Sequence, residues 1–420
     1  DCLLSRGLGD VYKRQVKILS DIVSIKTVNS NELEVAQYLE KLFNRYGIRS
    51  HIDTVTDGRA NLIATVGSSQ PVIGISGHMD VVSEGNHDHW TYDPFTLTED
   101  QGYLYGRGAA DMKSGLAALA IALIEIKESG KLTQGTIKFM ATVGEEMEQS
   151  GSQQLFEKGY ADDLDALLIA EPSFPSLVYA HKGSMDFRIK SKGRASHSSL
   201  PFLGQNAIKP LLEFIQNINQ EYEKITQSVK GESLDFSNMI NNLGSQLPNH
   251  ITKEKAQELI QGLVMTNSIV QGGTQVNSVP DFATAEFNVR TIPEYNNNKV
   301  KALFNEYIEQ ANQNGASLTQ ELYLDLEPVV TTGQNRLVEL GFDIAKSHFS
   351  NERDLIVTPT VAVTDASNLL KEKDENFPFL MFGPGNGPHQ INECVEKANY
   401  LEFVEYYIEF ITSYLNEENE

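Results

Sequence analysis

The stretch VIGISGHMD, residues 72–80, decides the class of fold. Its first five residues are mostly apolar and do not alternate with charged residues, which is typical of a strand buried on both faces of a sheet. Similar runs occur at 136–143, 166–170 and 378–382, and helical segments such as 115–126 lie between them. Buried strands separated by helices predict an α/β sheet with helices on both faces.

The middle of the chain follows a different pattern. Apolar and polar residues alternate between Gly183 and Pro293, as they do from Ala283 to Arg290, which is typical of a strand with one exposed face. This change predicts a smaller α+β domain inserted into the larger one. We expect an extension outside the fold at residues 1–14, a first part of the larger domain at 15–183, the inserted domain at 184–293 and a second part at 294–420.

Composition excludes several classes of protein. The chain has 420 residues, of which 57 are acidic and 34 basic, so its formal net charge of −23 would repel nucleic acid. No stretch approaches the roughly eighteen apolar residues of a membrane span, and no secretory signal is evident near the start. Cys2 and Cys394 form no CxxC pattern, so neither a disulfide framework nor a thiolate metal site is expected. These features predict a cytoplasmic protein with a small-molecule substrate.

Histidines and carboxylates follow four of the predicted buried strands, and one more carboxylate lies on a further loop. Ligands of open α/β sheets collect at the carboxyl ends of the strands, so we expect these side chains to converge on one crevice. The residues are His78, Asp80, Asp111, Glu145, Glu146, Glu171 and His389.

Five of these residues have the chemistry of a divalent-metal site. Two histidines and three carboxylates are more donors than one catalytic zinc uses, since that ion takes three protein ligands and a water. Two metals that share a bridging carboxylate would use all five donors. Zinc is the favoured metal, and cobalt or manganese would suit the same donors. The candidate ligands are His78, Asp111, Glu146, Glu171 and His389.

Spacing assigns separate roles to the neighbouring carboxylates. His78 and Asp80 face the same side of an extended backbone, so Asp80 can accept a hydrogen bond from the imidazole nitrogen that binds no metal. Glu145 and Glu146 diverge in an extended backbone, which lets Glu146 bind metal while Glu145 moves protons. Taken alone, Glu145-Glu146 could equally be solvated charges at a helix start.

The ordered motifs resemble a known family. They are His78-x-Asp80, Gly106-Arg107-Gly108-x-x-Asp111, Glu145-Glu146, Glu171-Pro172 and His389. Together they resemble the M20 metallopeptidases, in particular the branch of acetylornithine deacetylase and succinyl-diaminopimelate desuccinylase. The likeness runs from about Val16 to the C-terminus.

The resemblance implies the fold and the metal site. The larger domain would be a mixed-sheet α/β catalytic domain with two metals, and the inserted α+β domain would be a dimerisation or lid domain. One metal would be held by His78, Asp111 and Glu171 and the other by Asp111, Glu146 and His389, with Asp111 bridging. Glu145 matches the family's general base, and Asp80 matches its histidine-orienting carboxylate.

The resemblance extends into the inserted domain. The segment around His197 looks like the one whose histidine reaches the active site of the partner subunit, which implies a homodimer. Asn277 and Arg290 lie in motifs that bind the carboxylate end of the substrate, and a planar guanidinium suits that task. The implied reaction removes an N-acyl group, succinyl or acetyl, from an amino acid or diamino acid that carries a free carboxylate.

Two other functions remain open at this point. A dipeptidase or aminopeptidase of the same family would use the same chemistry with a different binding pocket. A non-catalytic metal-binding homologue would keep the fold, but it would have no use for a free carboxylate such as Glu145 beside the ligands.

Overall fold

The computed structural model describes residues 2–243, 247–248, 250–349, 354–385 and 387–416. The chain divides into two compact units. Unit 1 contains Asp1–Tyr179, Thr331–Thr358 and Thr364–Glu420, and unit 2 contains Ala180–Val330 and Pro359–Val363. The predicted class, an α/β fold with a smaller inserted α+β unit, is confirmed. None of the described helices is both long and apolar enough to cross a membrane.

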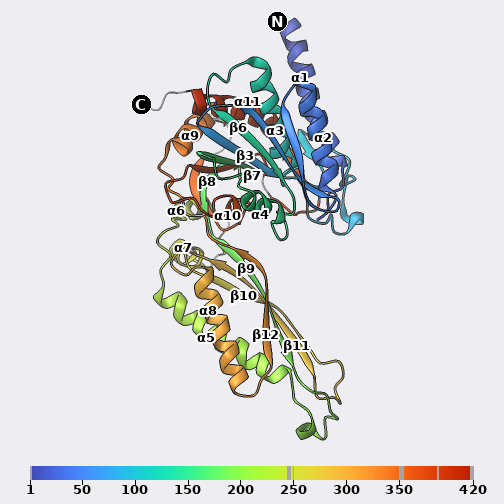
Figure 1. The fold of residues 1–420 in the computed structure, drawn as a ribbon, viewed down its shortest axis with the longest axis vertical. Helices are drawn as coiled ribbons and strands as arrows, with labels where there is room; N and C mark the ends of the chain where they lie inside the picture. The colour runs from blue at the N-terminus through green and yellow to red at the C-terminus, as the bar shows by residue number, and fades with distance from the viewer. Residues whose placement is uncertain (1, 244–246, 249, 350–353, 386, 417–420) are drawn as a thin grey trace. The chain divides into compact units, whose positions relative to one another are not determined.

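A mixed sheet of eight strands forms the framework around which unit 1 is built (Figure 1). Strand β3 runs parallel to both of its neighbours, β6 and β7, and β14 runs parallel to β7. The flanking pairs β1 with β2, β2 with β6 and β14 with β8 are antiparallel. The order across the sheet is β1 (Arg49–Thr56), β2 (Arg59–Gly67), β6 (Thr136–Thr142), β3 (Val72–His78), β7 (Ala166–Pro172), β14 (Phe379–Gly383), β8 (Ser176–His181) and β13 (Ile356–Thr360).

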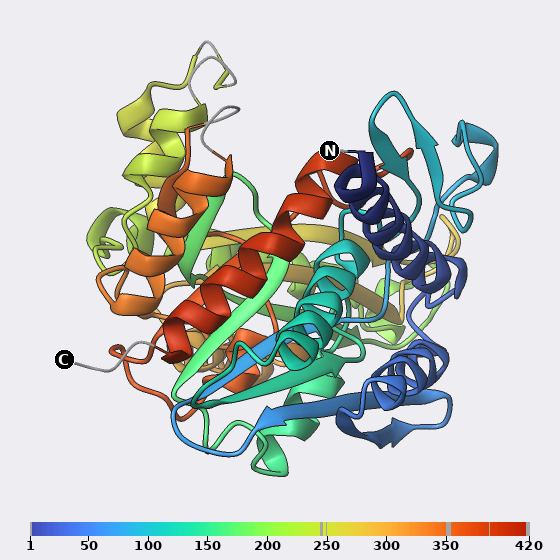
Figure 2. The same cartoon turned by 90° about the horizontal axis from the view of Figure 1, so that it is seen from above.

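Five helices bury one face of this sheet in a single apolar cluster. They are α1 (Cys2–Ser24), α2 (Glu32–Arg45), α3 (Lys113–Ser129), α9 (Arg336–Phe349) and α11 (Lys397–Asn416). Figure 2 shows α11, α3 and α1 side by side over the strands. Helix α1 includes residues 2–14, which we expected outside the fold, and its Arg14 forms an ion pair with Glu125 of α3.

The opposite face carries two short helices, α4 (Ser150–Glu157) and α10 (Ala366–Leu369). Phe139 of β6 belongs to the apolar cluster, so Thr142, three residues on, points to the other face. There its hydroxyl donates a hydrogen bond of 2.6 Å to Asp365, the residue before α10. A small sheet completes unit 1, with the order β15 (Cys394–Glu396), β5 (Tyr103–Tyr105) and β4 (Thr98–Asp100), and a 3-10 turn lies at His87–His89.

Gly115 sets the distance between helix α3 and strand β7. A Cβ atom at this position would lie 2.0 Å from the carbonyl oxygen of Ala170. Only glycine therefore lets the start of α3 approach the end of β7 so closely. This approach brings the loop that carries Asp111 next to the strand that carries Glu171.

Unit 2 contains a four-stranded antiparallel sheet with the order β10 (Val264–Gly272), β11 (Phe282–Thr291), β9 (Gly183–Lys192) and β12 (Leu318–Leu326). Helices α5 (Ile208–Ser228) and α8 (Asn297–Gln313) lie side by side against one face (Figure 1). The alternation predicted for Ala283 to Arg290 appears as alternating burial along β11. The remaining elements of this unit are η2 (Pro201–Leu203), α6 (Ser237–Leu243) and α7 (Lys253–Gln261).

Unit 2 continues beyond Pro293, where we expected the inserted domain to end. Strand β12 pairs with β9 along its length, and Phe304 of α8 stacks on Phe187 of β9 with ring centroids 4.3 Å apart. Both elements complete the core of unit 2, so the chain returns to unit 1 only after Val330.

Candidate metal centre

The predicted cluster lies at one edge of the large sheet. Strands β6, β3, β7 and β14 are neighbours and run parallel, so their carboxyl ends meet there. His78 ends β3, Glu171 lies in the last part of β7, and the loop after β14 carries His389. Glu145 and Glu146 follow β6 after a short turn, and Asp111 lies just before α3. All of these residues belong to unit 1.

Asp111 lies between the two histidines. Its Oδ1 atom is 3.1 Å from Nε2 of His78, and its Oδ2 atom is 3.3 Å from Nε2 of His389. Glu171 Oε1 is 3.6 Å from the same nitrogen of His78, and Glu146 Oε2 is 2.9 Å from that of His389. The five side chains thus form two groups of donors that share one carboxylate.

The charge of this cluster fits divalent cations. Potential ligand atoms of His78, Asp111 and Glu146 lie within 4.8 Å of one another, as do those of His78, Glu145 and Glu171. Burial raises the pKa of Glu171 well above its ordinary value, and burial also raises the pKa of Glu146. Carboxylates crowded in a buried site need positive charge to stay ionised. Imidazole nitrogens and carboxylate oxygens without thiolate are donors that suit zinc and similar ions, so the residues present fit such a metal.

The histidines themselves supply part of the positive charge. Hydrogen bonds with Asp111 and Glu146 raise the pKa of His389 to about 10. Burial opposes ionisation of Asp111, but its hydrogen bonds with His389 and His78 lower its pKa overall. Metal ions would take the place of these protons, because a metal-bound imidazole must offer an unprotonated nitrogen.

His78 is oriented by the backbone carbonyl of Asp80, whereas we predicted that the carboxylate of Asp80 would accept this hydrogen bond. Its Nδ1 lies 2.9 Å from the backbone carbonyl oxygen of Asp80, whereas the Asp80 carboxylate is 3.6 Å away. The carbonyl can only accept, so Nδ1 donates to it, and Nε2 shares its own proton with Asp111 until a metal takes the place of that proton. Loss of that proton leaves the tautomer that a metal-binding histidine needs.

The buried carboxylate of Asp80 holds the turn after β6. Oδ1 accepts the backbone N–H of Glu145 at 3.2 Å, and Oδ2 accepts that of Glu146 at 3.1 Å. These two bonds fix the point where the adjacent glutamates diverge. Spacing had indicated a role for Asp80 on the histidine alone, because the fold of the turn was not visible in the sequence.

Glu145 is supported by side chains that sequence reasoning missed. Its Oε1 accepts a hydrogen bond of 2.9 Å from Nε2 of the buried Gln149, which in turn contacts Asn368. Burial and then the charge of Glu171 raise the pKa of Glu145 well above its ordinary value. Burial also raises the pKa of the nearby Asp365 to about 6. Asp365 acts through a contact between distant segments, and the four-residue spacing of Gln149 from Glu145 forms no recognised motif.

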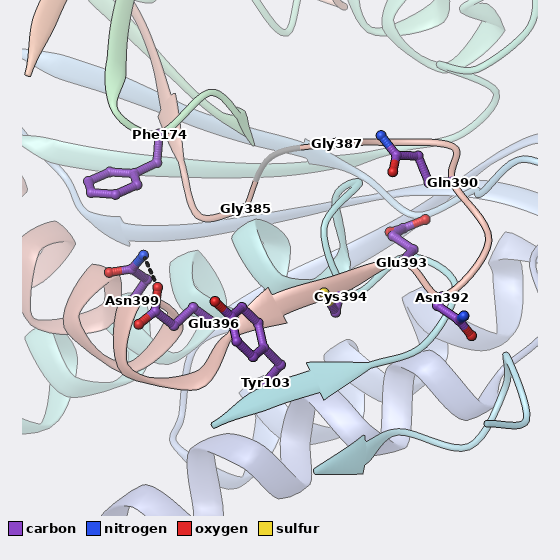
Figure 3. Close-up of a pocket in the computed structure, with 10 residues that line it drawn as sticks. All are labelled: Tyr103, Phe174, Gly385, Gly387, Gln390, Asn392, Glu393, Cys394, Glu396 and Asn399. Atoms are coloured by element: carbon purple, nitrogen blue, oxygen red, sulfur yellow. Dashed lines mark hydrogen bonds between the residues drawn. The ribbon is translucent and has the colours of Figure 1, made fainter. Parts of the chain in front are cut away.

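Two further residues beside the cluster had no predicted role. Arg107 and Glu393 form a buried ion pair that spans the Asp111 loop and the segment after His389. Glu393 also borders a cavity of about 240 Å³ that is lined by Tyr103, Gln390 and Asn399 among others (Figure 3). A glutamate four residues after a candidate ligand was the one signal in the sequence that would have pointed to it.

The substrate-binding candidates lie in unit 2. His197 and Asn277 are exposed, and their segments lie side by side, because the Ser198 N–H donates to the Asn277 carbonyl at 3.0 Å. Nδ1 of His197 is 2.7 Å from the hydroxyl oxygen of Ser199. Arg290 is half-buried on β11, burial lowers the pKa of its guanidinium, and among the described residues that group has no hydrogen bond or ion pair.

The sequence profile described as "Peptidase family M20/M25/M40" matches residues 74–413. The chain belongs to this family. A Staphylococcus aureus relative named "Probable succinyl-diaminopimelate desuccinylase" is 44% identical over 407 residues, which cover 96% of this chain and 98% of the relative. The resemblance drawn from the motifs is confirmed, and the M20 chain is a metal-dependent hydrolase of linear amide bonds.

Solved structures of M20 proteins share the fold. An M20 family metallo-carboxypeptidase from Sulfolobus solfataricus superposes with a TM-score of 0.79 at 19% identity, covering 95% of this chain and 99% of its own. A Bacillus subtilis protein described as a dinuclear metal binding peptidase from the M20 family superposes with a TM-score of 0.65 at 17% identity, covering 96% and 98%. At these identities the likeness establishes the fold.

Proposed function

We propose that this M20 hydrolase removes an N-succinyl group from an amino acid or diamino acid, with N-succinyl-diaminopimelate as the first substrate to test and N-acetyl compounds as alternatives. The observation that carries the proposal is the similarity to the desuccinylase-named Staphylococcus aureus protein over nearly the whole length of both chains. The small number of cysteines favours a cytoplasmic location for this reaction.

Two divalent metals would serve the reaction, with zinc as the first choice and cobalt or manganese as alternatives. His78, Asp111 and Glu171 would hold one ion, and Asp111, Glu146 and His389 would hold the other. The two contacts of Asp111, one from each carboxylate oxygen to a different histidine, support this division. When bound, the metals would polarise the amide carbonyl as Lewis acids and make water more acidic.

Glu145 is the proposed general base. It takes a proton from the attacking water and later delivers that proton to the nitrogen of the leaving amine. The hydrogen bond of 2.9 Å from Gln149 supports this role, because it holds the Glu145 carboxylate beside the candidate ligands. The bonds of Asp80 to the backbone of Glu145 and Glu146 keep the base separate from the neighbouring ligand.

Unit 2 would recognise the substrate. Arg290 and Asn277 bind its free carboxylate, and the guanidinium supplies two parallel hydrogen bonds. His197 steadies the oxyanion of the tetrahedral intermediate in the active site of the partner subunit, so the active unit is a homodimer. The exposed position of His197 and the unpaired guanidinium of Arg290 among the described residues support these roles.

A substrate panel tests the proposal. Metal-stripped protein restored with zinc, cobalt or manganese is assayed on N-succinyl-diaminopimelate, other N-succinyl and N-acetyl amino acids, and free dipeptides. We expect the highest kcat/KM with an N-succinyl compound. Preference for dipeptides would favour a peptidase instead, and no turnover with any metal would contradict a catalytic role.

A further inference from the structure

The carboxylate of Glu393 accepts hydrogen bonds from the loop that carries Asp111. Its side chain is fully buried, and Oε1 accepts the backbone N–H groups of Ala110 at 2.8 Å and Asp111 at 3.0 Å. The other oxygen pairs with Arg107. The backbone carbonyl of Glu393 also accepts the N–H of Gly106 at 3.0 Å. One residue thus binds the loop at both of its ends.

Arg107 joins this contact to a third segment. Its guanidinium is buried against the Trp90 ring, 5.2 Å from the ring centroid, and it donates a bond of 3.1 Å to the Ser83 carbonyl. The backbone N–H of Arg107 donates to the Pro94 carbonyl at 2.7 Å. These contacts hold Arg107 in place, so the Asp111 side of the ion pair is well supported.

The segment that carries His389 has far less support of its own. The described residues of this loop, 384–385 and 387–392, form no backbone hydrogen bonds with other segments. The side chain of His389 is half-exposed, with 50% of its surface accessible, whereas that of His78 is fully buried at the end of β3. Figure 3 shows the loop passing Gly387 and Gln390 before it reaches Asn392 and Glu393 at the start of β15.

Two adjacent side chains anchor the end of this loop. Asn392 accepts the backbone N–H of Thr91 at 2.7 Å, and Glu393 makes the contacts with the Asp111 loop described above. Of the two, only Glu393 connects the loop directly to another candidate ligand. The distance between His389 and Asp111 therefore depends on Glu393 more than on any backbone contact in the described part of the loop.

We propose that Glu393 is a positioning residue that fixes His389 relative to Asp111 and so sets the affinity for the metal held by Asp111, Glu146 and His389. The inference rests on the proposed two-metal function. The site of His78, Asp111 and Glu171 depends on it less, because two of its three donors come from strands of the large sheet.

The test is a calorimetric titration of metal-stripped protein with Zn²⁺, repeated with Co²⁺ while its visible absorption is followed. The unchanged protein should show two binding events. Glu393→Gln places an amide N–H₂ against the donors of Arg107, and partners of metal ligands typically change affinity by about 10–100-fold when mutated. We expect that loss in one event and a clearly smaller change in the other, because Asp111 is shared by both sites. Ile411→Ala is the matched control, since it opens the buried core of α11 without touching either loop.

The outcomes of the titration distinguish the positioning role of Glu393 from the two-metal function. The positioning role alone would be overturned if Glu393→Gln left both binding events intact. It would also be overturned if Glu393→Gln weakened both events by the same factor, as a general loss of stability in Ile411→Ala would do. A single event in the unchanged protein would overturn the two-metal function as well. Should Glu393→Gln fail to fold, the pair Arg107→Met with Glu393→Leu removes both buried charges, which proteins often tolerate. The same selective loss is expected from that double variant.

Discussion

Replacing Glu145 by glutamine separates proton transfer from metal binding. Glutamine keeps the length of the side chain, and its amide oxygen can still accept the 2.9 Å hydrogen bond from Gln149. The bonds from the Asp80 carboxylate reach backbone N–H groups and do not depend on the side chain. General-base catalysis is typically worth about 10²–10⁴-fold, so kcat should fall by that factor, which corresponds to about 2.7–5.4 kcal/mol.

The assay compares kcat on an N-succinyl substrate with the metal content of the same preparation. We expect two metals per subunit in both proteins and a nearly unchanged KM. A kcat within about tenfold of that of the unchanged protein would refute the assignment of Glu145 as the base. Loss of metal in Glu145→Gln would instead show that this carboxylate is needed as a ligand.

The same variant makes an independent prediction for the metal-free protein. The pKa of Glu145 is raised in the folded state, chiefly by burial. The folded protein therefore binds more protons than the unfolded chain once the pH passes the ordinary glutamate pKa of about 4.3, and its stability falls as the pH rises from there. Metal-free Glu145→Gln should thus melt at a higher temperature than the unchanged protein at pH 8, and an equal or lower Tm would contradict the raised pKa.

Three other variants test separate parts of the structure. Arg290→Ala should raise KM for substrates with a free carboxylate by about tenfold or more in steady-state kinetics, since a charged hydrogen bond is worth about 1.5–3 kcal/mol; an unchanged KM would exclude the contact. Asp80→Asn should lower kcat by about 10–100-fold, because an amide nitrogen cannot accept the N–H of Glu146, and turnover equal to that of the unchanged protein would contradict this. Gly115→Ala should lower the free energy of unfolding in urea by about 1–3 kcal/mol, because its Cβ would meet the Ala170 oxygen at 2.0 Å. An increase, the usual effect of alanine in a helix, would show that α3 can shift.

The convergence of the candidate ligands was predictable because most of them follow buried strands, directly or through a short loop. His78 and Glu171 lie in or at the end of apolar runs, and parallel neighbours bring such ends together. Glu393 was not predictable, since it acts through a tertiary contact that no short motif encodes. Gln149 lies only four residues from Glu145, but the spacing alone does not show that the two side chains meet. The substrate-binding roles of the unit 2 residues stay predictions, and so does the role of Glu145 as the base.

The end of the inserted domain was placed too early for a different reason. Strand β12 has an apolar alternation at Leu322, Leu324 and Leu326 that signals a half-exposed strand, the same pattern that marked β11. We instead expected the chain to return to the larger domain at residue 294, where the alternation from Ala283 to Arg290 had ended. Applying the alternation rule beyond that point would have assigned β12 to unit 2.

The position of β14 in the large sheet has a consequence for biosynthesis. Strands β7 and β8 follow one another in the chain, yet β14 lies between them and is translated more than a hundred and fifty residues later. Until β14 has been translated, the place between β7 and β8 stays empty, and the loop that carries His389 cannot reach the site beside Glu171. Parallel pairing across such a long separation is slow to form, so we expect β14 to join the sheet late in folding and to bring the loop of His389 to the other candidate ligands only then.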